Sequence, residues 1–68
     1  MRELKKALFE ELQIGDVVVV VCQHFGNIDA GIVVYIGKGG LTIEGLLDGK
    51  ESSVHRLNNI FYILQEEE

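Results

Sequence analysis

The side chains best suited to bind a ligand lie near the C-terminus, in a segment that contains His55, Arg56 and Asn58. A guanidinium group such as that of Arg56 can stack on a nucleobase or contact a phosphate, which is the ordinary chemistry of single-strand binding. Arginine is also common in protein interfaces, where Arg56 could pair with an acid such as Glu51 or Asp48. A neutral histidine on a strand is more often packed or solvated than a ligand. The segment therefore predicts a binding surface and leaves its ligand open.

Two other groupings lack the partners that their chemistry requires. Cys22 and His24 lie two residues apart, on one face of a predicted strand, but no third and fourth metal ligands follow at suitable spacing. Residues 37–40 read Gly-Lys-Gly-Gly, but they precede a strand and lack both the Walker spacing and its hydroxyl residue. No Ser-His-Asp, Cys-His or paired-carboxylate arrangement is present in the sequence. We predict a protein that is not an enzyme and that binds no metal or other cofactor.

The length of the chain predicts one domain over residues 1–68, with a small core. A domain of this size buries only about 60% of the surface that its unfolded chain exposes. The lone cysteine, Cys22, excludes an internal disulfide, so self-association is the expected source of further stability. We also expect a reduced, cytoplasmic location without membrane association, because the longest apolar stretch, Val17 to Cys22, is too short to cross a bilayer.

The charge of the chain opposes non-specific binding to phosphate backbones. Six basic and eleven acidic side chains give a net charge of −5. Three of the acids form an acidic tail over residues 66–68, which we expect to be solvated. Without this tail the balance is six basic against eight acidic side chains, so nucleic acid is not excluded as a ligand.

Residues 1–14 predict an N-terminal helix, because Leu4, Leu8 and Leu12 recur at steps of four. The charges in this segment oppose the helix dipole, with Lys5 near its positive end and Glu11 near its negative end. Such a short helix does not persist alone, so we expect its leucine stripe to dock on the rest of the domain.

Residues 15–65 predict five short antiparallel strands separated by turn signals. The expected ranges are 17–22, 28–36, 41–47, 51–57 and 60–64. Alternation in the second range places Ile28, Ala30, Ile32, Val34 and Ile36 on one apolar face, and Asp29, Gly31, Val33 and Tyr35 on the other. Gly31 in mid-strand predicts sharp coiling of the sheet, and Asp48-Gly49 predicts a hairpin.

Residues 54–63, Val-His-Arg-Leu-Asn-Asn-Ile-Phe-Tyr-Ile, resemble the second signature of the Sm/LSm RNA-binding proteins. In that family an Arg-Gly-Asn-type turn joins the fourth strand to the fifth. The element order expected for this chain, a helix and then five strands, is also similar to that of Sm proteins and of bacterial Hfq. The resemblance implies a mainly β fold, in which an N-terminal α-helix precedes a five-stranded antiparallel Sm-like (SH3-like) barrel. Leu57 stands where the family has glycine, so we expect Asn58 to adopt a left-handed conformation.

The resemblance also implies an assembly and a function. Sm-like subunits close rings by pairing edge strands, so we expect a cyclic homo-oligomer of five to seven copies that binds single-stranded RNA or DNA at its pore and acts in nucleic-acid processing. The last strand, residues 60–64, is apolar on both faces, and a bare edge of this composition would aggregate, so we expect it to need a partner strand from another subunit. The expected subunit interface comprises Val54, Ile60, Phe61, Tyr62 and Ile63. The expected nucleic-acid-binding residues are Lys38, Gly39, Gly40, His55, Arg56 and Asn58. The rival hypothesis is an SH3-like interaction or assembly module that docks a protein and does not bind nucleic acid.

Overall fold

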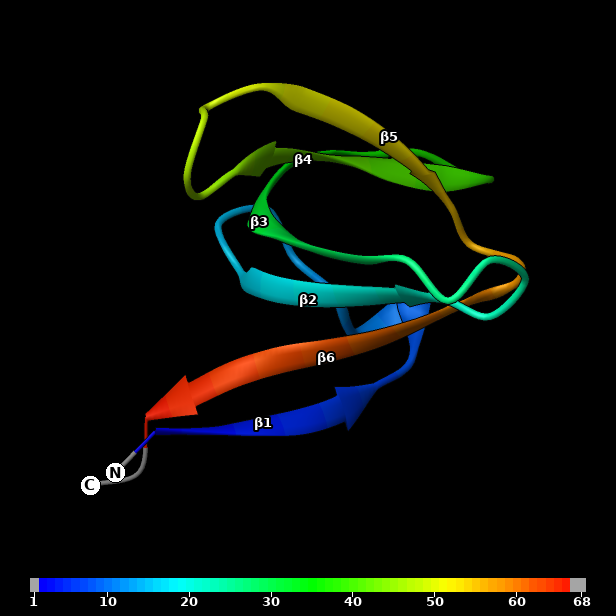
Figure 1. Ribbon diagram of the computed structural model, residues 1–68. Helices are drawn as coiled ribbons and strands as arrows, with labels where there is room; N and C mark the ends of the chain where they lie inside the picture. The colour runs from blue at the N-terminus through cyan, green and yellow to red at the C-terminus, as the bar shows by residue number, and fades with distance from the viewer. Residues whose placement is uncertain (1, 67–68) are drawn as a thin grey trace.

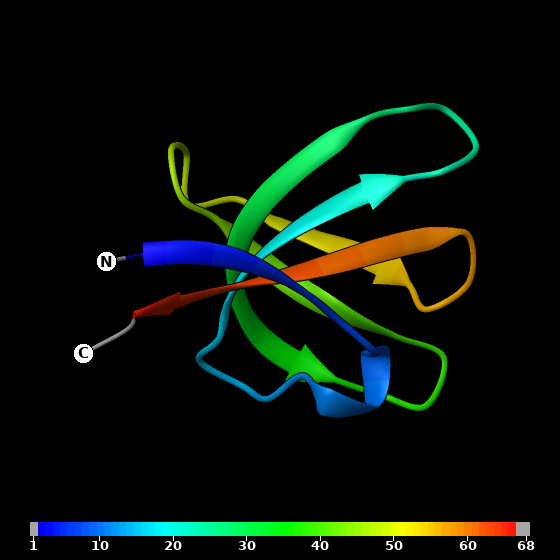
Figure 2. The same cartoon turned by 90° about the horizontal axis from the view of Figure 1, so that it is seen from below.

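The computed structural model describes residues 2–66, which form six antiparallel strands in one strongly curved sheet (Figures 1 and 2). The strands follow the order β1-β6-β2-β3-β4-β5 across the sheet. Their bounds are β1 Arg2–Ala7, β2 Val17–Cys22, β3 Ile28–Ile36, β4 Gly40–Gly45, β5 Glu51–His55 and β6 Asn59–Glu66. Strands β1 and β5 are the two edges, so the sheet is not closed into the predicted barrel.

The prediction of an N-terminal helix over residues 1–14 is wrong. Residues 2–7 form β1, and the helical part of the described segment is one 3-10 turn, Phe9–Glu11. Strand β1 runs antiparallel along β6, with Leu4 opposite Leu64. As a helix, this segment would carry charges that oppose the helix dipole. As a strand, it forms a ladder of backbone hydrogen bonds with β6 and covers the edge of that apolar strand. Within residues 2–66, no helix has the length and apolar composition needed to span a bilayer.

The hydrophobic core fills the concave side of the sheet. Its residues come from β2, β3, β4 and β6 and from the segment that follows the 3-10 turn. In that segment Leu12 is buried, whereas Leu4 and Leu8, the other leucines of the predicted helical stripe, are exposed. Phe61 of β6 is 3% exposed and contacts the ring of Phe9 from the 3-10 turn. The complete core is Leu12, Val18, Val20, Val33, Leu41, Ile43 and Phe61.

Strand β3 has the predicted bounds but buries the opposite face. Gly31 and Val33 are buried, whereas Ile28 and Ile32 are exposed. A bulge between Val33 and Tyr35 then shifts the alternation. Gly31 faces β4 so closely that a Cβ at this position would lie 2.6 Å from the Glu44 carbonyl oxygen. The predicted sharp coiling at Gly31 therefore corresponds to a close approach of two backbones.

Strand β6 has no free edge. It pairs with β2 on one side, Phe61 opposite Val20, and with β1 on the other, Phe61 opposite Ala7. The expectation that this apolar strand needs a partner is thus met within the chain. The prediction that its edge is bare is wrong, because the N-terminal segment supplies the missing strand. Of the predicted acidic tail, residue 66 ends β6, while residues 67–68 lie outside the described part of the chain.

Candidate binding surface at three turns

Three turns meet at one end of the sheet, on the right in Figure 1. They join β2 to β3, β3 to β4 and β5 to β6. The β5–β6 turn lies between the other two: the backbone N–H of Arg56 donates to the Gly39 carbonyl (3.0 Å), and the N–H of Gln23 donates to the Asn58 carbonyl (2.9 Å). Backbone hydrogen bonds therefore hold all three turns as one surface.

The β5–β6 turn is made by Asn58, as predicted. Its φ of 65° lies in the left-handed region, which asparagine tolerates better than most side chains. Asn59 closes the turn, because its Nδ2 donates to the carbonyls of His55 (2.8 Å) and Leu57 (3.3 Å). This leaves Leu57 exposed at the tip of the turn.

Arg56 is held within its own chain. Its Nη2 forms an ion pair with the Glu10 carboxylate, and its guanidinium carbon lies 4.8 Å from the centre of the Phe9 ring. The Phe9 ring in turn contacts Phe61 of the core, with 6.0 Å between centroids. The acidic partner of Arg56 is thus Glu10 of its own chain, and the suggested pairing with Glu51 or Asp48 across an interface stays a prediction. The Arg56 side chain remains 40% exposed, so it still faces solvent.

The first of two grooves on this surface, the turn groove, has a volume of about 530 Å³. Its most prominent side chain is Phe25, which is 74% exposed and meets the His24 ring edge-on at 4.6 Å. Within the described part of the chain no carboxylate lines it, although the sequence as a whole is acidic. The turn groove is lined by Cys22, His24, Phe25, Gly39, His55, Arg56, Leu57, Asn58 and Asn59. It brings together four of the six residues predicted to bind nucleic acid.

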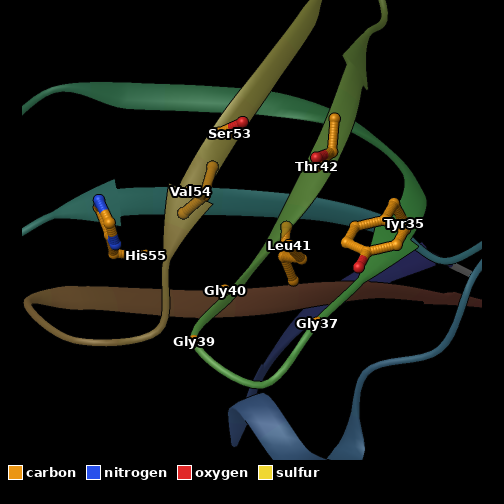
Figure 3. Close-up of a pocket in the computed structure, with 9 residues that line it drawn as sticks. All are labelled: Tyr35, Gly37, Gly39, Gly40, Leu41, Thr42, Ser53, Val54 and His55. Atoms are coloured by element: carbon orange, nitrogen blue, oxygen red, sulfur yellow. The ribbon is translucent and has the colours of Figure 1, made fainter.

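The second groove, the glycine groove, adjoins the first at Gly39 and His55, which line both. Figure 3 shows Tyr35 of β3 and His55 of β5 on either side of a floor that contains Gly40. The groove holds about 300 Å³, and Tyr35 is 61% exposed. Its lining is Tyr35, Gly37, Gly39, Gly40, Leu41, Thr42, Ser53, Val54 and His55.

The two predicted glycines of the β3–β4 loop differ in role. A Cβ on Gly40 would overlap the Val54 carbonyl oxygen, whereas a Cβ on Gly39 would meet no atom within 4 Å. Gly40 therefore allows a close approach to β5 of the same chain. Lys38, the remaining predicted residue, is exposed in the same loop and lines neither groove.

The predicted interface residues are distributed differently from expectation. Phe61 is buried in the core, and Ile60, Tyr62 and Ile63 are half-buried in β6 between its two neighbours. Val54 lies on the edge strand β5 and packs against the core.

Cys22 and His24 do not share a strand face, because β2 ends at Cys22 and His24 lies in the following turn. Cys22 is half-buried with a free thiol. Among the residues that the structure describes, no three His, Cys, Asp or Glu side chains are grouped closely enough to hold a metal ion.

No family model, curated protein or solved structure matches this chain. The site thus has to be interpreted from its own side chains. Sequence reasoning missed Phe25, Tyr35 and Glu10. Phe25 had a usable signal, since it precedes Gly26-Asn27 at a predicted reversal, where a large aromatic side chain has little core to enter.

Proposed function

We propose that the turn groove and the glycine groove together bind single-stranded nucleic acid, RNA or DNA, with little sequence preference. The observation that carries the proposal is the lining of the turn groove, which combines Phe25, Arg56 and Asn58 and, among residues 2–66, contains no carboxylate. Aromatic faces and guanidinium groups stack on unpaired bases of any sequence, and amide side chains contact base edges.

The arrangement suggests a path for the strand. Phe25 in the turn groove and Tyr35 in the glycine groove offer one exposed aromatic ring each, and the two grooves meet at Gly39. Lys38 projects from the loop that separates the rings and supplies a cation for a phosphate. Because Arg56 forms an ion pair with Glu10, it contributes a surface for base stacking more than an uncompensated positive charge.

Two features are ones that the Sm-like resemblance leads us to expect. The five predicted strands lie in a single antiparallel sheet, and Asn58 makes the turn that the family makes with glycine. In this proposal the binding surface belongs to one chain and needs no pore. A ring of five to seven subunits would have to close through β1 and β5, because both sides of β6 are already paired.

A second candidate function, an SH3-like module that docks a protein, is favoured by a different observation. Large apolar side chains are exposed at the β4–β5 turn, on the left in Figure 1, where Leu46 is exposed and Leu47 fully exposed. Ile28, the exposed first residue of β3, lines the same groove as these two leucines. Contiguous apolar surface of this kind is typical of protein contacts. The net charge of −5 also suits a protein partner better than a phosphate backbone.

The two functions are separated by fluorescence anisotropy with labelled oligo-U and oligo-A at low salt, where phosphate attraction is strongest. We expect both oligonucleotides to bind and Phe25→Ala to weaken binding roughly tenfold or more, the usual cost of losing a stacked aromatic ring. Leu47→Ala is the matched control, since it removes an exposed apolar side chain that lines neither groove. If neither oligonucleotide binds, the nucleic-acid function is refuted and the protein-docking function remains.

A further inference from the structure

Strand β5 presents a regular, unpaired backbone edge. Hydrogen bonds from Gly45 N–H to the Lys50 carbonyl and from Arg56 N–H to the Gly39 carbonyl mark the two ends of its ladder with β4. In an antiparallel pair, bonded and non-bonded positions alternate. The backbone N–H and C=O groups therefore point toward β4 at residues 50, 52, 54 and 56. Those of Glu51, Ser53 and His55 point outward, away from the sheet.

We propose that two copies of this chain pair antiparallel through β5, with Ser53 on the two-fold axis. This register sets Ser53 opposite its own symmetry mate, and Glu51 of each copy opposite His55 of the other. All three positions carry outward backbone groups, so the pairing can form up to six inter-chain hydrogen bonds. The His55 carbonyl already accepts one bond from Asn59, and its second lone pair is left for the partner.

The complementarity of Glu51 and His55 points to a second copy as the occupant of this edge. The side chains of Glu51 and His55 lie on the same face, and the two-fold axis brings an acid against an imidazole at both ends of the pairing. The next positions, Lys50 of one copy and Arg56 of the other, carry like charges, but both lie outside β5, and Arg56 is engaged by Glu10. A closed two-fold pairing also removes both β5 edges at once, which prevents further growth of the sheet.

The other free edge does not match this pattern. Strand β1 carries the adjacent lysines Lys5 and Lys6, and edge lysines are a common means of preventing strand addition. No lysine lies within β5. The same comparison disfavours head-to-tail pairing of β5 with β1, the arrangement that would build a ring or a filament.

The proposal does not depend on nucleic-acid binding, because the pairing leaves Phe25, Arg56 and Asn58 of the turn groove uncovered. It reaches the turn groove at His55 and the glycine groove at Ser53, Val54 and His55. A dimer can exist without oligonucleotide binding, and binding can occur without a dimer.

The first test is the molar mass of the full chain in solution, measured by light scattering and sedimentation over a wide range of concentration. We expect a species of twice the 7.6 kDa chain mass at high concentration. H55E places two carboxylates opposite each other at both ends and should raise the dimer dissociation constant roughly tenfold. The double swap E51H/H55E restores complementarity and should restore the dimer, which separates a charge effect from misfolding.

The register is tested by cysteine cross-linking in a Cys22→Ala background. S53C places two thiols across the axis and should form an inter-chain disulfide under mild oxidation, whereas the neighbouring control S52C should not, because Ser52 faces Val54 of the other copy. A monomer at every concentration overturns the proposal. So does a species of five to seven chains, a dimer unaffected by H55E, or equal cross-linking at positions 52 and 53.

Discussion

Replacing Gly40 by alanine should separate β4 from β5, while the same change at the neighbouring Gly39 should be harmless. A Cβ on Gly40 overlaps the Val54 carbonyl oxygen, which belongs to a backbone and cannot rotate away. Gly39 has nothing within 4 Å of its Cβ position, and its φ lies outside the left-handed region. The pair thus compares one chemical change at adjacent positions of the same loop.

The magnitude follows from the contact. Relieving the overlap requires the two strands to move apart, which costs about 1–3 kcal/mol for overpacking together with about 1 kcal/mol for a weakened ladder hydrogen bond. A chain of this length has a total free energy of unfolding of only about 3–10 kcal/mol. We therefore expect G40A to lower the melting temperature by more than about 8 °C. G39A should leave it unchanged or raise the stability by up to about 1 kcal/mol, since alanine restricts the unfolded chain.

The assay is urea and thermal unfolding followed by circular dichroism, on both variants and the parent protein. Equal stability of G40A and the parent would refute the close approach of β4 and β5. A loss in G39A as large as that in G40A would show that the loop requires glycine for conformational freedom. In that case steric overlap at Gly40 would not be the cause of the lost stability.

Two further variants test the β5–β6 turn. Asn58→Ala should cost about 1 kcal/mol in urea unfolding because of its left-handed φ, whereas Asn58→Gly should match the parent in stability; equal losses in both would point to a side-chain role. Glu10→Gln should change the unfolding free energy by less than about 0.5 kcal/mol, because the ion pair is exposed, and should tighten oligonucleotide binding at low salt by releasing Arg56; weaker binding would place Arg56 outside the nucleic-acid contact.

The strands that the sequence predicts well are those defined by their own residues. Both β2 and β3 begin and end at the expected positions, because a β-branched run and an alternating run are each bounded by turn residues. The left-handed Asn58 was predictable for the same local reason. The face that β3 buries was not, because it depends on how closely β4 approaches Gly31 and on a bulge after Val33.

The candidate site was predicted in part. His55, Arg56 and Asn58 do lie together with Gly39, because the β5–β6 turn is bonded to the β3–β4 loop. The engagement of Arg56 by Glu10 is a contact between residues 46 positions apart, created by the path of the N-terminal segment. Local pattern carries no signal for such a contact.

The N-terminal segment and β6 resolve each other's difficulties. As a helix, residues 2–13 would carry charges that oppose the dipole, and Leu4 and Leu8 would need a docking site. As a bare edge, β6 would expose an apolar strand that is prone to aggregate. Pairing the two gives both segments backbone partners and leaves Leu4 and Leu8 exposed. The need for a partner strand was therefore a sound inference from composition, and it carried no information on whether that strand came from another chain or from the same one. Because β1 already pairs with β6 within the chain, assembly through β6 requires β1 to detach from the sheet. Assembly through β5 requires no rearrangement of the sheet.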